Sequence, residues 1–75
     1  MPDFFEFETR KQEPILININ RISFVIKYKG LAVVYDVDGQ QFETNEDYDD
    51  FKMRLNAAIS LNFDKTYKMY KIPNQ

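Results

Sequence analysis

The sequence predicts an α+β domain, in which an antiparallel meander of about five strands is covered by one amphipathic helix and followed by a short basic C-terminal segment. Three observations support this class. Apolar residues alternate with polar ones over most of the chain as far as Thr44. The dipeptides Lys29-Gly30 and Asp38-Gly39, which are typical of tight hairpin turns, divide the central stretch. From Asn45 onward the apolar spacing changes from two to three and four, which is the period of a helix.

The chain of 75 residues is long enough for one domain with one modest core. Seven Phe and five Tyr enlarge that core, because each buried ring contributes a large apolar area. The sequence has neither Cys nor His, so we expect no disulfide, no metal site of the usual zinc type, no cofactor and no enzymatic activity. No apolar run approaches the length of a membrane helix, and we therefore expect a cytoplasmic protein without membrane contacts.

Strands are expected at residues 3–9, 14–19, 22–28, 31–37 and 40–44. If both central turns contain two residues, the first sets Tyr28 opposite Leu31, Phe24 opposite Tyr35 and Ile22 opposite Val37, and the second sets Tyr35 opposite Phe42. This register collects the large apolar residues of the two central strands on one face, which we expect to be buried: Ile22, Phe24, Ile26, Tyr28, Leu31, Val33, Tyr35 and Val37. A slip of one residue would turn the whole set outward.

The first two strands should turn Phe5, Phe7, Ile15 and Ile17 toward the same core. In the central stretch, Asp36 is expected as a solvated outward side chain and Asp38 as a turn residue before glycine. These two aspartates are two positions apart, a spacing that could in principle serve acid-base chemistry or a hard cation. The sequence lacks the later ligands of a calcium-binding loop, which favours the structural interpretation.

A helix is expected over residues 46–59, capped by Thr44 or Asn45. Its apolar stripe should cover the sheet and consists of Tyr48, Phe51, Leu55, Ala58 and Ile59. Asp50 and Arg54 stand four positions apart and could form an ion pair along the helix. Residues 63–75 fit a strand and a helix equally well, and Pro73 would end either one.

The C-terminal segment combines cations with aromatic rings. Lys65, Lys68 and Lys71 recur at intervals of three, and Tyr67 lies among them. Lysines neutralise phosphates and aromatic rings pack on sugars or bases, so this combination is compatible with nucleic-acid binding. A solvated lysine face above an apolar aromatic face is the alternative interpretation of the same residues.

A longer pattern runs from about Glu13 to Ile72. It consists of Ile17-Asn18 followed by Ile22 and Phe24, then Val37-Asp38-Gly39 before Phe42, a capped helix, and Phe63-Asp64-Lys65-Thr66-Tyr67-Lys68-Met69-Tyr70. The pattern resembles the LytTR family of DNA-binding domains, and also the small flagellar FlbD-type proteins. The LytTR family reads Phe-x-Arg-x-His-Arg-Ser-Tyr in the last segment, so both of its arginines are lysines here.

The resemblance implies a small transcription regulator that binds double-stranded DNA through this segment. Lys65 and Lys68 stand where the family has basic DNA-contacting residues, and Tyr67 stands where it has histidine. Under this hypothesis Lys65, Lys68 and Lys71 contact phosphates, and Tyr67 contacts a base or a sugar.

The second hypothesis, from a different class, is a protein-protein interaction module, for example an accessory or phage-type regulator that has the fold without DNA binding. The chain carries a net charge of -2, and residues 43–50 hold five acids and no base. Asp47, Asp49 and Asp50 could contact a basic partner, although acids are also expected at the start of a helix. An open sheet edge is the other candidate surface, and it could support a homodimer.

Overall fold

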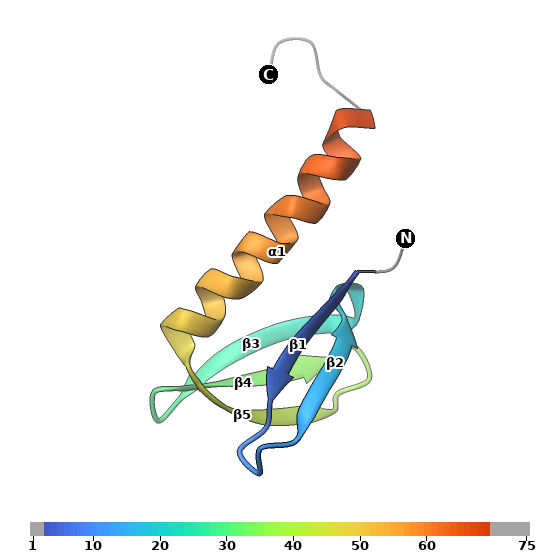
Figure 1. Ribbon diagram of the computed structural model, residues 1–75. Helices are drawn as coiled ribbons and strands as arrows, with labels where there is room; N and C mark the ends of the chain where they lie inside the picture. Colours follow the sequence, from blue (N-terminus) through green and yellow to red (C-terminus); the bar gives the residue numbers. More distant parts are fainter. Residues whose placement is uncertain (1–2, 70–75) are drawn as a thin grey trace.

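The computed structural model describes residues 3–69, with the side chains of residues 3–59. Strands β1 (Phe4–Glu8) and β2 (Pro14–Asn18) form a two-stranded antiparallel sheet. A 3-10 turn, η1 (Ile19–Arg21), leads into a three-stranded antiparallel sheet of β3 (Ile22–Tyr28), β4 (Leu31–Asp36) and β5 (Gln41–Asp47), with β4 in the centre. Helix α1 (Tyr48–Met69) follows directly (Figure 1). The predicted α+β class is confirmed, with the five strands divided between two sheets.

The core lies where the β1-β2 hairpin and the first half of α1 pack on one face of the three-stranded sheet. Phe51 of α1 is fully buried, and its ring meets Phe5 and Phe7 edge-on at centroid distances of 5.3 and 5.7 Å. Such tilted aromatic pairs stabilise a core beyond the area that they bury. The core cluster consists of Phe5, Phe7, Ile17, Ala32, Val34 and Phe51. The predicted inward faces of the first two strands are therefore confirmed.

The first central turn has the predicted length. Lys29 and Gly30 both adopt positive φ, 53° and 85°, as a two-residue primed turn requires. The turn sets Tyr28 opposite Leu31 and brings Phe24 opposite Tyr35, as expected. At the far end the pairing differs from the prediction, because a bulge between Ile22 and Phe24 places Ile22 opposite Asp36 instead of Val37.

The second central turn is one residue longer than predicted. The amide of Gly39 donates to the carbonyl of Asp36 and the amide of Asp36 donates to the carbonyl of Gln40, both at 3.0 Å, so three residues form the loop. Gly39 has a φ of 86°, which is typical of the bulge that closes a three-residue hairpin loop. Tyr35 consequently pairs with Gln41, and Phe42 pairs with Val34. The predicted pairing of Tyr35 with Phe42 is wrong.

Asp36 holds this longer turn in place. Its side chain is buried, and one carboxylate oxygen accepts hydrogen bonds from the amides of Asp38 and Gln40, each at 2.9 Å. Asp38 itself pairs with Arg21 across the end of the sheet. The prediction of a solvated Asp36 is therefore wrong, because an aspartate at the start of a turn can cap the backbone amides that the turn leaves unpaired.

The central strands turn the opposite face to the core from the one that was expected. The face that packs on the core carries Val25, Ala32, Val34 and Phe42. Phe24, Ile26 and Tyr28, which were expected to be buried, are 52%, 39% and 50% exposed. Val37 is 54% exposed at the second turn. The expected burial is wrong for these four residues, because β4 is apolar on both faces and alternation in β3 did not identify the core side.

Helix α1 begins two residues later and continues further than predicted. The cap is Asp47, whose carboxylate accepts from the amides of Asp49 and Asp50 at 3.0 and 3.2 Å. The predicted caps Thr44 and Asn45 belong to β5. The apolar stripe packs on the core as expected except for Ile59, which is 43% exposed.

At its C-terminal end the helix extends to Met69, so the strand interpretation of residues 63–69 is wrong; residues 70–75 lie outside the described residues. No Gly or Pro occurs between residues 48 and 69, so the sequence supplies no breaker at residues 60–62, where the predicted helix ended. The last turns of α1 extend beyond the strands (Figure 1).

Candidate interaction surface

The three-stranded sheet has a second face, turned away from the core, which we call the open face. Its side chains come from β3, β4 and β5 and are Phe24, Ile26, Tyr28, Val33, Tyr35, Gln41 and Glu43. Val33 in the centre is only 3% exposed because the larger side chains around it cover it. The open face is thus a layer of apolar side chains with a small buried centre and half-exposed aromatic residues around it.

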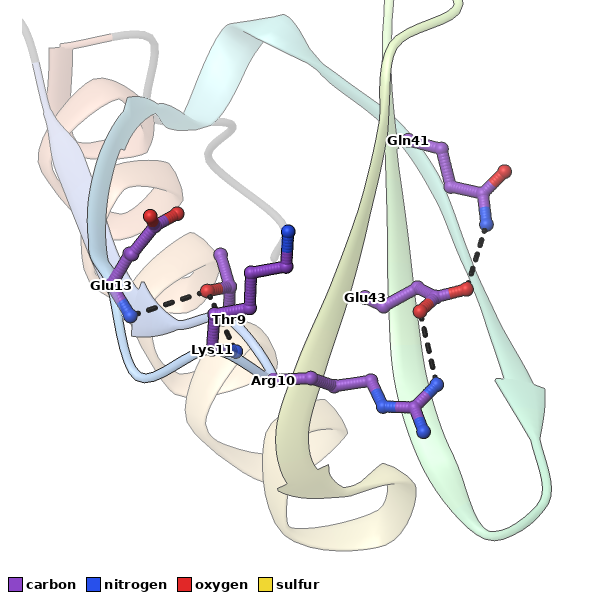
Figure 2. A pocket seen from close by; sticks show the side chains of 6 residues that line it. All are labelled: Thr9, Arg10, Lys11, Glu13, Gln41 and Glu43. Atoms are coloured by element: carbon purple, nitrogen blue, oxygen red, sulfur yellow. Dashed lines mark hydrogen bonds and ion pairs between the residues drawn. The ribbon is translucent and has the colours of Figure 1, made fainter.

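Two adjoining hollows mark this side of the protein. One, of about 390 Å³, is lined by apolar side chains of β3 and β4 and by two polar residues of β5: Ile26, Tyr28, Val33, Tyr35, Gln41 and Glu43. The other, of about 410 Å³, lies between β5 and the loop that joins β1 to β2 (Figure 2), and its lining is Thr9, Arg10, Lys11, Glu13, Gln41 and Glu43. Both hollows share Gln41 and Glu43 and therefore adjoin along β5, and we call them together the depression, with an apolar part and a polar part.

The loop between β1 and β2 forms the wall of the polar part. Thr9 shapes this loop, since its hydroxyl accepts from the amides of Lys11 and Glu13, both at 3.2 Å. The loop is joined to the edge of β5 by a bridge between Thr9 and Thr44 and by a hydrogen bond of 2.9 Å from the amide of Arg10 to the carbonyl of Glu43. The free edge of β5 is therefore covered at this point.

Charged side chains lie at the margin of the open face. Figure 2 shows Arg10 reaching across to Glu43, with 3.0 Å between Nη1 and Oε1, and Gln41 approaching the second oxygen at 3.4 Å. At the other margin, the ammonium of Lys29 lies 5.4 Å from the centre of the Tyr28 ring. The centre carries no charge, and the stacked rings of Phe24 and Tyr35, 4.5 Å apart, extend its apolar area.

Comparisons with known proteins give no assignment. No family model, no curated protein and no solved structure matches the chain. The resemblance to LytTR domains and to FlbD-type proteins therefore stays a prediction. Within the described residues, no helix is long and apolar enough to cross a membrane, and no cluster of three or more potential metal-ligating side chains occurs.

The predicted DNA-contacting residues fall at and beyond the end of α1. Lys65, Tyr67 and Lys68 belong to the last turns of the helix, where the structure describes the backbone but not the side chains. Lys71 lies outside the described residues. Because these residues follow one another in a helix, their spacing is now known to be helical up to Met69, and DNA contact through them stays a prediction.

The predicted acidic surface is the N-terminus of α1. Asp47 is engaged as the helix cap, while Asp49 and Asp50 are exposed in the first turn, where negative charge stabilises the helix dipole. These positions explain the acids without a partner, and a role of Asp47, Asp49 and Asp50 in binding stays a prediction.

Arg54 is held by a residue other than the expected Asp50. Its guanidinium donates two hydrogen bonds to the carboxylate of Glu46, at 2.8 and 2.9 Å, and a third to the carbonyl of Glu6 at 3.1 Å. It also lies over the Phe5 ring at 4.6 Å. The hydrogen bond with Glu46 raises the pKa of Arg54, although partial burial opposes this. Arg54 thus joins α1, β1 and the end of β5 and has a structural role.

Sequence reasoning identified the residues of the open face but assigned them to the core. The available signal was the run from Leu31 to Tyr35, which is apolar at five consecutive positions and so predicts a strand covered on both faces. In the structure β4 is indeed the central strand, with the core on one side and the open face on the other. β4 therefore has one apolar side packed against the rest of the chain and one apolar side on the open face.

Proposed function

We propose that the protein is a non-enzymatic interaction module and that the open face is the surface with which it binds a protein partner. The observation that carries the proposal is the half-exposure of Phe24 and Tyr28 on one continuous apolar face. Removing apolar area from water contributes about 25 cal/mol per Å² of transfer free energy, from which the costs of association are subtracted. Contiguous exposed apolar patches on small proteins commonly mark interaction surfaces.

The composition of the open face favours a protein over a nucleic acid. β3 contributes only apolar side chains to this face, and Arg10 at its margin is already neutralised by Glu43 at 3.0 Å. Binding to nucleic acid depends on cations that can replace the counterions of the phosphates. The ring faces of Phe24 and Tyr35 are stacked on each other, which leaves fewer ring faces for bases.

The polar groups around the depression support a binding role over a catalytic one. Glu43 is engaged by both Arg10 and Gln41, and Thr9 is engaged by two backbone amides. This arrangement supplies an uncharged centre with a polar rim, which is the usual organisation of a protein interface.

The proposal can be tested by site-specific photocrosslinking in cells that make the protein. Tyr28 is replaced by benzoyl-phenylalanine, and the matched control carries the same substitution at Phe4, an aromatic residue of equal exposure (53%) on the outer side of the β1-β2 hairpin. A discrete protein adduct that forms from position 28 and not from position 4 is the expected result. No adduct, equal adducts from both positions, or an adduct with nucleic acid at position 28 would refute the proposal.

A further inference from the structure

The open face has the properties of a self-complementary surface. Its centre is apolar and uncharged on β3 and β4, so two copies of it can meet without burying an unpaired charge. Its rim carries both signs, with Lys29 near Tyr28 and Glu43 on β5. In a two-fold contact the same patch serves both subunits, so a rim that carries both signs does not repel its own copy.

The area of the open face can be compared with the area that a dimer needs. An aromatic side chain carries 150–250 Å² of surface, so the half-exposed Phe24 and Tyr28 each present roughly 100 Å². With Ile26 and the partly exposed Tyr35 the apolar centre reaches roughly 300 Å². The exposed rim side chains of Arg10, Lys29, Gln41 and Glu43 contribute roughly as much again. Two copies would thus bury roughly 1,200 Å², which is the lower end of the range for specific interfaces.

The edge strand β3 also favours the association of two copies. Within the described residues β3 pairs only with β4, and its other edge is open. Edge strands of monomeric proteins usually present charged side chains that discourage association. In β3 the single charged residue is Lys27, whose ammonium lies 5.9 Å from the centre of the Tyr48 ring, so it is turned away from the open face. Nothing charged on β3 opposes contact at the open face.

We propose that the occupant of the open face is a second copy of the chain, and that the two three-stranded sheets stack face to face. Two stacked sheets lie about 10 Å apart and interdigitate their side chains, as in a β-sandwich. In this homodimer the side chains of Phe24, Ile26 and Tyr28 lose their exposure, and β4 becomes buried on both sides. The inference rests on the proposed function and names its partner.

The test measures the mass of the wild-type chain by sedimentation equilibrium from about 10 μM to about 500 μM, a range that covers dimers of modest affinity. The variant Ile26→Glu places a charge in the centre of the face, where it is 39% exposed. The control Leu16→Glu makes the same kind of change in a strand on the outer side of the hairpin, where the side chain is 64% exposed.

A concentration-dependent dimer is expected for the wild type and for Leu16→Glu, with a dissociation constant at least tenfold higher for Ile26→Glu. A second measurement needs no variant: on dilution, the amide resonances of residues on β4 and β5, such as Val33 and Gln41, should shift together with those of β3. Shifts confined to β3 would indicate pairing of strand edges and would overturn the stacked arrangement. Equal loss of the dimer in Ile26→Glu and Leu16→Glu would also overturn it.

A wild-type chain that stays monomeric over the whole range would overturn the homodimer. The proposed function is then tested by the photocrosslinking experiment alone, because the mass of the adduct distinguishes a second copy of the chain from another protein. An adduct of twice the chain mass at position 28 supports the homodimer. An adduct of any other protein mass overturns the homodimer while supporting the interaction module.

Discussion

Thr44 offers a sharp test of how β5 is joined to the rest of the domain. The ladder between β4 and β5 is irregular here, since Leu31 pairs with Asp47 but Val33 pairs with Glu43. Three residues of β5 therefore stand opposite Ala32 alone. The Thr44 side chain is fully buried, and its hydroxyl donates to the carbonyl of Ala32 at 2.7 Å and accepts from the amide of Glu46 at 3.2 Å. The hydroxyl replaces the ladder bonds that the irregularity removes.

The change Thr44→Val keeps the shape of the side chain and removes both hydrogen bonds. Leaving a buried carbonyl unsatisfied costs about 1–3 kcal/mol, so we expect the free energy of unfolding to fall by about 2 kcal/mol. The change Thr44→Ser keeps the hydroxyl and removes one methyl group, which should cost about 1 kcal/mol. A domain of this size has a total stability of roughly 4–11 kcal/mol, so both variants should fold.

Urea unfolding followed by far-ultraviolet circular dichroism measures both changes. With a slope of about 1 kcal/mol per molar urea for a small domain, Thr44→Val should lower the midpoint by about 2 M and Thr44→Ser by about 1 M. The reasoning would be refuted if the valine variant were as stable as the wild type, or if the serine variant were the less stable of the two. Either result would mean that packing of the methyl group, and not the hydroxyl, holds this part of β5.

Three further predictions concern other parts of the chain. Gly39→Ala should lower the free energy of unfolding, measured by thermal unfolding, by about 1 kcal/mol. The φ angle of Gly39 is 86° and no atom lies within 4 Å of the added Cβ, so only backbone strain contributes. A change near zero would contradict the left-handed conformation. Arg54→Met should cost about 0.5–1 kcal/mol, since the pair with Glu46 is partly exposed. Because the pKa of Arg54 is raised in the folded state, the stabilisation by Arg54 is present below its ordinary pKa and is lost only as pH rises through the higher folded value. The difference in the free energy of unfolding between Arg54→Met and the wild type should therefore stay constant between about pH 6 and about pH 9. A change within that range would contradict this reasoning. Finally, the LytTR resemblance predicts that titration of labelled protein with a DNA duplex shifts the amides of residues 65–71 at low salt, and that these shifts weaken steeply as salt rises. The absence of shifts at low salt would refute DNA binding through this segment.

The sequence was sufficient for the fold class and for most of the pairing between β3 and β4. Lys29-Gly30 has a strong preference for one turn type, and this preference correctly paired Phe24 with Tyr35. The inward faces of β1 and β2 were also predictable, because Phe5 and Phe7 alternate with glutamates, and Ile15 and Ile17 have the same spacing of two. These elements follow from local signals that the tertiary structure does not override.

The orientation of the sheet was not predictable from the same signals. Asp38-Gly39 suits a two-residue turn and equally the end of a three-residue loop, and the choice depends on whether the Asp36 carboxylate can reach the amides beyond it. The two alternatives place opposite sides of β5 on the core. The open face could not be identified before this choice was known, because Ala32 and Val34 are as apolar as Val33 and Tyr35.

The three-residue loop between β4 and β5 has a consequence for how the chain can vary. Surface loops usually accept insertions and deletions, because their length has little effect on the elements they connect. Here, removal of one residue between Asp36 and Gln40 keeps the register only if the two remaining residues form a primed turn. If a three-residue loop forms again, it takes in Asp36 or Gln40 and shifts β5 by one position against β4, so that Phe42 leaves the core and Gln41 and Glu43 enter it. Length changes should therefore be tolerated in the loop between β1 and β2 before they are tolerated at this hairpin.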